Sequence, residues 1–201
     1  MKNLGKLLII SAIAMIAFYF VYNFSVKEKD KLEVNEYIEQ TSIVEEKVNE
    51  PPVEEVVEEK KEEKRTINYT AVLEIPSINL KQGVVNSTKN FGSINYAISV
   101  DKNSNYPDQK GNFILYAHSG NSSIAYFKNL NKVEINDDIY VYYNGTKYHY
   151  EIYDKYDIQK TGKAKVVSST SYNYITLITC NQSKKDKQIV VVGRLIDSAT
   201  Y

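Results

Sequence analysis

The stretch DDIYVYYNGTKYHYEIYDKYDI, residues 137–158, carries the clearest local folding signal in the chain. β-branched and aromatic residues flank Asn144-Gly145, a dipeptide that readily adopts the positive φ angles of a two-residue hairpin turn. Because side chains alternate between the two faces of a strand, the second arm has one polar face and one largely apolar face. The polar face carries Lys147, His149 and Glu151, and the other carries Tyr148, Tyr150 and Ile152. The pattern predicts a β-hairpin on which His149 is a solvated surface residue.

Further segments of strand-like composition lie on both sides of this hairpin. They are AVLEIPSINLKQGVV (71–85), GNFILYAHS (111–119), YITLITC (174–180) and QIVVVGRLI (188–196). Only SSIAYFKNLNKV (122–133) looks partly helical. Seven or eight short strands with little helix favour an all-β domain, either a closed barrel or a sandwich. We place this domain at residues 66–201.

Composition narrows the possible partners. The 201 residues include 25 Lys and Arg and 25 Asp and Glu, so the formal net charge is zero. A neutral chain of this kind lacks the basic excess of a general polyanion binder, and we expect no nucleic-acid partner. The length allows one ordinary domain plus attachments.

The N-terminal segment predicts a membrane anchor, which we place at residues 1–27. The run from Leu7 to Val26 contains no charge and is long enough to cross ~30 Å of hydrocarbon as a helix. Lys2 and Lys6 precede it, which favours a cytoplasmic N-terminus and a single-pass protein whose remainder lies outside the cell membrane. A cleaved secretory signal is the alternative, but aromatic residues crowd the place where cleavage would occur.

Residues 28–65 read as a linker. They are rich in Glu and Lys and contain Pro51-Pro52, with too few apolar residues for a core of their own. We expect this segment to be disordered or partly helical, since Glu and Lys favour solvated helices. Its expected role is to hold the folded domain away from the bilayer.

Cys180 and His118 have similar positions in the sequence. Each ends an apolar strand and is followed by a polar loop, and Cys180 is the only cysteine. A lone thiol cannot form an internal disulfide, and one Cys with one His falls short of the four ligands of a structural metal site. A core histidine is the ordinary reading of His118, but the shared position favours a Cys–His pair for nucleophilic catalysis, with no metal and no cofactor.

These residues carry a resemblance to a known family. TLITC (176–180) fits a Thr-Leu-x-Thr-Cys signature, LYAHSG (115–120) lies about sixty residues upstream, and IVVVGRLI (189–196) follows. With these motifs the chain resembles the sortases, membrane-anchored cysteine transpeptidases of Gram-positive cell surfaces, over roughly Ala71 to Ile196. The resemblance implies a closed eight-stranded β-barrel with one or two short helices, preceded by a transmembrane helix and a charged stalk.

The resemblance also implies a reaction and partners. Cys180 would attack a C-terminal sorting signal of an exported protein, similar to Leu-Pro-x-Thr-Gly, and form an acyl-thioester. His118 would protonate the leaving amine and then accept a proton from the incoming nucleophile. That nucleophile would be an amine of a peptidoglycan precursor or of a pilin.

The chain departs from the family at one position. The family arginine normally stands just before the apolar run of the last strand, where this chain has Lys187-Gln188. A hairpin closing through 181–187 sets Gln188 opposite Cys180 and leaves Arg194 about 20 Å further along at ~3.3 Å per residue. As oxyanion donor or substrate-orienting group we therefore expect Gln188, Lys187 or backbone amides around Thr179.

Two other functions fit the same residues. A thiol peptidase would use the same Cys and His with water as acceptor. A non-catalytic surface module that binds sorting signals would explain the anchor, the linker and the tyrosine-rich domain, but not the thiol.

The acidic residues available for calcium, such as Asp101 and Asp137, read as solvated turn residues. The sequence leaves the sortase subclass open.

Overall fold

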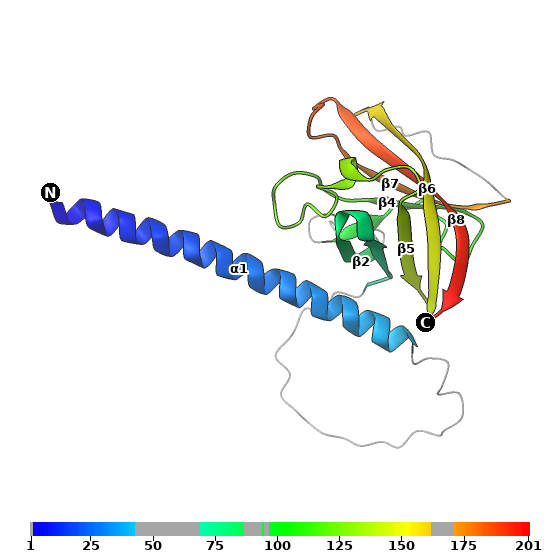
Figure 1. Cartoon of the computed structure of the whole chain (residues 1–201), viewed down its shortest axis with the longest axis horizontal. Coiled ribbons are helices and arrows are strands. Elements are labelled where there is room, and N and C mark those ends of the chain that lie inside the picture. Colours follow the sequence, from blue (N-terminus) through cyan, green and yellow to red (C-terminus); the bar gives the residue numbers. More distant parts are fainter. Residues whose placement is uncertain (1, 43–68, 87–93, 95–96, 162–170) are drawn as a thin grey trace, which may run out of the picture.

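The computed structural model describes residues 2–42, 69–86, 94, 97–161 and 171–201. Most of these residues form a closed β-barrel that lies beside one long N-terminal helix (Figure 1). The all-β class predicted from the strand pattern is confirmed, and of the two architectures it left open the closed barrel, which the family resemblance implied, is the one observed.

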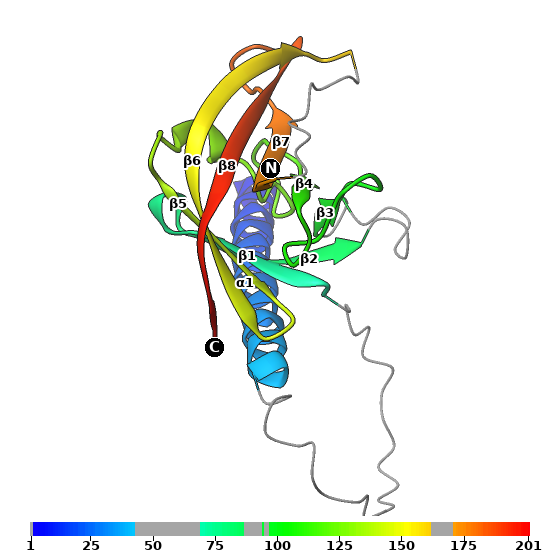
Figure 2. The ribbon, with the colours of Figure 1, turned by 90° about the vertical axis from the view of Figure 1, so that its right-hand side faces the viewer.

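Eight strands close the barrel in the order β1-β2-β3-β4-β7-β8-β6-β5 (Figure 2). They are β1 (Ala71–Ile75), β2 (Leu80–Asn86), β3 (Ile98–Val100), β4 (Gly111–Tyr116), β5 (Asp138–Tyr143), β6 (Thr146–Gln159), β7 (Asn173–Cys180) and β8 (Lys187–Thr200). Two neighbouring pairs, β2–β3 and β4–β7, are parallel, and the other pairs are antiparallel. The parallel pair β4–β7 brings together two segments about sixty residues apart in the chain.

The predicted hairpin joins β5 to β6. Asn144 and Gly145 have φ angles of 48° and 73°, as the two-residue turn requires. The paired register sets Tyr143 against Thr146, and Tyr150 and Ile152 are completely buried in the barrel core. The predicted apolar face is therefore confirmed.

The barrel interior is filled by alternate residues of every strand. Leu73, Phe113, Leu115, Leu177 and Val191 are almost completely buried there. The segment 122–133, predicted to be partly helical, contains a single 3-10 turn, η4 (Leu130–Lys132). Another 3-10 turn, η2 (Pro76–Ile78), separates β1 from β2. Phe127 and Leu130, from the segment between β4 and β5, pack into the barrel core.

The helix α1 (Lys2–Ser42) continues without a break through the boundary expected near residue 27. One stretch of it is long and apolar enough to cross a membrane, and the side chains of that stretch are not buried inside the protein. The remainder of the predicted linker, residues 43–65, lies outside the described residues.

The second half of α1 packs on the barrel rather than standing free of it. Val34 is 2% exposed and packs with Val72 and Tyr142 on the outside of the sheet. The Tyr37 hydroxyl donates to the Thr70 carbonyl at 2.7 Å. Residues 28–42 therefore act as a docking helix in this structure (Figure 2).

We predict that Phe127→Ala lowers the free energy of unfolding by about 3–5 kcal/mol, because it removes a large buried side chain from the barrel core. Phe127 is 1% exposed. Ile135→Ala is the control, since Ile135 is 49% exposed and should change stability by less than about 0.5 kcal/mol. Urea unfolding followed by circular dichroism measures both, and equal effects would contradict this account of the core.

Candidate active site

The parallel pairing of β4 and β7 determines where Cys180 and His118 lie. The last paired residues are Tyr116 and Ile178, and the Ala117 amide continues the ladder by donating to the Ile178 carbonyl at 3.4 Å. The ends of β4 and β7 therefore lie side by side on one rim of the barrel. His118 follows the end of β4 by two residues, and Cys180 is the last residue of β7, so the same register continued by two residues would set them level.

Side-chain alternation assigns a face to this pair. Leu115 and Leu177 belong to the core, so Tyr116 and Ile178 point outward, and by the same alternation Cys180 also points outward. Cys180 is a partly exposed free thiol. It is therefore accessible to a reagent or substrate that approaches the outer surface of the barrel.

The two strand ends are tied together directly beside the pair. The Thr179 hydroxyl, which is buried, donates to the Ala117 carbonyl at 2.9 Å. One of the three predicted orienting residues, Thr179, thus uses its side chain to join the Cys180 strand to the end of β4. The loop after His118 is also fixed, because the Phe127 amide donates to the His118 carbonyl at 3.0 Å.

Strand β8 carries Gln188 and Lys187, the residues expected to take the place of the family arginine. Cys180 pairs with Gln188, whereas Arg194 pairs with Tyr174 at the other end of β7. The register expected from the sequence is confirmed, and Arg194 lies six residues from Gln188, or about 20 Å along the strand. Lys187 begins β8 and pairs with Gln159 of β6, so it lies one position further from Cys180 along the strand.

Asn181, which was not among the residues singled out from the sequence, builds the turn after Cys180. The Asn181 side-chain oxygen accepts hydrogen bonds from the amides of Ser183 and Lys184 at 2.9 and 3.1 Å. Its Nδ2 donates to Asp157 at 2.9 Å, and Lys184 Nζ donates to the same carboxylate at 2.6 Å. An asparagine opening a polar loop is a known turn signal, but nothing in the sequence pairs it with Asp157, which comes from β6.

This carboxylate is held in its charged form. Hydrogen bonds from Lys184 and then Asn181 keep the pKa of Asp157 below its usual range. The ionised form accepts both donors, so the turn is anchored at neutral pH.

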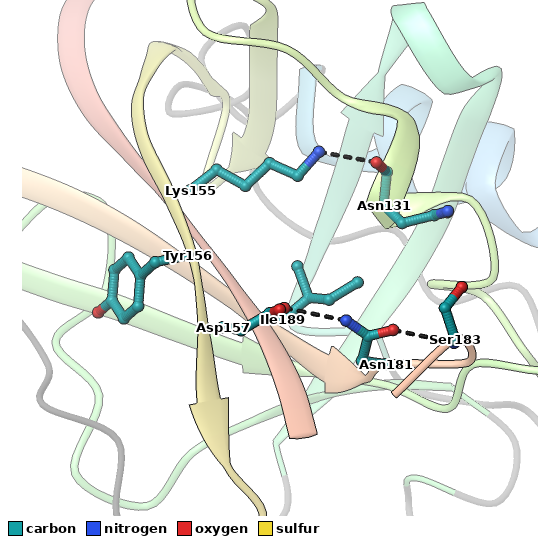
Figure 3. A pocket seen from close by; sticks show the side chains of 7 residues that line it. All are labelled: Asn131, Lys155, Tyr156, Asp157, Asn181, Ser183 and Ile189. Atoms are coloured by element: carbon teal, nitrogen blue, oxygen red, sulfur yellow. Dashed lines mark hydrogen bonds between the residues drawn. The ribbon is translucent and has the colours of Figure 1, made fainter. Parts of the chain in front are cut away.

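A polar pocket of about 410 Å³ lies beside this turn (Figure 3). Its lining residues come from η4, β6, β8 and the β7–β8 turn: Asn131, Lys155, Tyr156, Asp157, Asn181, Ser183 and Ile189. Lys155 Nζ donates to the carbonyls of Asn131 and Val133 at 2.7 and 2.8 Å. Cys180 and His118 do not line this pocket, although Asn181 is the chain neighbour of the thiol.

The second histidine lies apart from the strand ends. His149 pairs with Tyr140 within the β5–β6 hairpin, and its Nε2 lies 2.6 Å from Asp138 Oδ1. It is on the polar face, as predicted, but the carboxylate and the Tyr140 ring hold it there. Among the described residues, no group of three or more His, Cys, Asp or Glu could hold a metal ion.

Comparisons with known proteins agree with this architecture. The family model described as sortase domain matches residues 73–196, which is more than half of the chain. No curated protein matches the sequence.

Solved sortase structures share the fold. Sortase C-1 from Actinomyces oris superposes with a TM-score of 0.59 at 22% identity, over 64% of this chain and 74% of that one. A Clostridium perfringens sortase D5 transpeptidase gives 0.59 at 18%, over 85% and 95%. Listeria monocytogenes sortase A gives 0.57 at 23%, over 66% and 90%. Since the family model spans the barrel from β1 to β8 and includes both strand ends, the chain belongs to the sortase family of cysteine transpeptidases.

Proposed function

We propose that this protein cleaves a C-terminal sorting signal, similar to Leu-Pro-x-Thr-Gly, of exported proteins and transfers the acyl group to an amine of the cell wall or a pilin. The observation that carries the proposal is the parallel β4–β7 register, which sets the ends of two distant strands side by side. Cys180 is the nucleophile and His118 is the acid and base.

The chemistry of the pair supports these roles. A free thiol has a pKa near 8.5, so a neighbouring imidazolium favours the thiolate that attacks the peptide carbonyl. Histidine, with an ordinary pKa near 6.5, gives a proton to the leaving amine and later takes one from the acceptor amine. The thioester formed between the two steps retains the acyl group until the acceptor arrives.

Gln188 is our proposed donor to the tetrahedral oxyanion. It pairs with Cys180 across β7–β8, and its amide N–H groups can donate to developing negative charge. A neutral amide donor of this kind is worth ~3 kcal/mol in other acyl-transfer enzymes. Lys187, the next residue on β8, is the second candidate because its ammonium also donates.

The proposed setting is the outer surface of the cell membrane, with the N-terminus in the cytoplasm. α1 supports this setting because its apolar stretch is free of charge and unburied. The partners are then an exported protein that bears the sorting signal and a surface amine such as that of a peptidoglycan precursor.

We predict that Cys180→Ala abolishes acyl-enzyme formation and that His118→Ala lowers turnover by about 10²–10⁴-fold, because each removes a group that takes part in the chemistry. His149→Ala should remain near wild type, since His149 lies on the β5–β6 hairpin. Turnover of a fluorogenic sorting-signal peptide measures all three. Retained activity in Cys180→Ala would refute the mechanism.

Mass spectrometry of the same peptide substrate separates transfer from hydrolysis. The mass of the product formed with and without an added amine identifies the acceptor. A product unchanged by amine would favour the thiol peptidase, and absence of any labelling at Cys180 by a peptide thiol trap would favour the binding module.

We predict that Gln188→Ala lowers kcat about 10²-fold with KM little changed, because the lost donor acts on the transition state. Gln188→Arg should retain or raise kcat, since it supplies a charged donor at the same register. Arg194→Ala is the control and should stay within about twofold of wild type, given its ~20 Å separation along the strand. Equal losses in Gln188→Ala and Arg194→Ala would contradict the assignment.

We predict that Asp157→Asn lowers kcat/KM roughly fivefold at pH 7, because the turn after Cys180 loses its charged anchor. The pKa of Asp157 is lowered in the folded state, so its contribution is present above the unfolded pKa near ~4 and is lost as pH falls further. The difference in thermal midpoint between wild type and variant should therefore shrink as the pH is lowered below about 4. Asp154→Asn is the control, and a pH-independent difference would refute the role of Asp157.

A further inference from the structure

A cleft of about 660 Å³ separates α1 from the barrel. One wall consists of α1 residues from the end of its apolar stretch onward, and the other consists of residues from η2, β2 and the loop after His118. The residues that carry the argument are Tyr19, Phe20, Lys27, Lys81 and Lys128.

The helix wall places this cleft at the membrane surface. Phe18, Tyr19, Phe20 and Tyr22 crowd the end of the charge-free run, and Lys27 is the first charge after it. Aromatic residues followed by lysine are typical of the interface between hydrocarbon and headgroups. With Tyr19 and Phe20 in one wall, the cleft opens at headgroup level when α1 spans the bilayer.

The charges that line the cleft favour an anion. Four lysines, Lys27, Lys31, Lys81 and Lys128, line it, against one carboxylate, Asp30. Lys31 and Lys81 have ion-pair partners in Glu28 and Glu74. Within the described part of the chain, Lys27 and Lys128 form no ion pair, and Asp30 is engaged by a hydrogen bond from Tyr126.

We propose that the cleft between α1 and the barrel binds the headgroup of an anionic phospholipid. The phosphate lies between Lys27 and Lys128, and the acyl chains leave along Tyr19 and Phe20. A lipid is the occupant because one wall belongs to the membrane-spanning helix and carries aromatic residues beside the lysines. The site holds the barrel, with the loop after His118, down on the bilayer.

Native mass spectrometry of the full chain tests the proposal. Protein in detergent micelles is titrated with phosphatidylglycerol or with phosphatidylcholine of identical acyl chains. Wild type should retain one phosphatidylglycerol at least about tenfold more tightly than phosphatidylcholine. The double variant Lys27→Gln/Lys128→Gln should lose about tenfold in phosphatidylglycerol affinity.

Lys102→Gln/Lys110→Gln is the matched control, because both lysines are exposed on the barrel and neither lines the cleft. It should bind phosphatidylglycerol as wild type does. Equal retention of the two lipids, or wild-type affinity in the cleft variant, would overturn the proposal. Displacement of the lipid by millimolar inorganic phosphate would also overturn it, since the site would then be one for a free anion. Labelling of Cys180 is measured in parallel and does not depend on the outcome.

Discussion

The parallel pairing of β4 with β7 is the contact on which the rest of this structure depends. Parallel neighbours cannot be joined by a tight turn, and here the β5–β6 hairpin lies between β4 and β7 in the chain and pairs elsewhere in the barrel, with β1 and β8. The β4–β7 pairing then brings the end of β4 to the end of β7. The bond from Thr179 to the Ala117 carbonyl fixes that register one residue before the thiol.

The candidate nucleophile Cys180 lies at the end of a strand, and a turn follows it directly. Cys180 ends a strand whose inner face is core, and a single register pairs it with Gln188. The turn that follows is held by Asn181 and by a carboxylate from β6. Such an arrangement holds Cys180 on a strand and fixes the turn that follows it.

The helix α1 is held against the barrel more closely than a flexible stalk would be. Val34 and Tyr37 dock its second half on β1 and the residues before it, and Asp30 meets Tyr126 in the loop after His118. The helix α1 and the loop after His118 are therefore in direct contact.

Local sequence signals determined the elements of this fold. Asn144-Gly145 specified a hairpin, alternation specified the buried faces, and the short 181–187 turn specified that Gln188, not Arg194, meets Cys180. The position of His118 and Cys180 at strand ends suggested a pair, but the approach of these two strand ends depends on a parallel register between distant strands, which no local pattern encodes. The docking of α1, the pairing of Asp157 with Asn181 and the cleft between α1 and the barrel were also decided only by tertiary structure. Each depends on contacts between residues far apart in the chain, where burial and geometry outweigh local propensity.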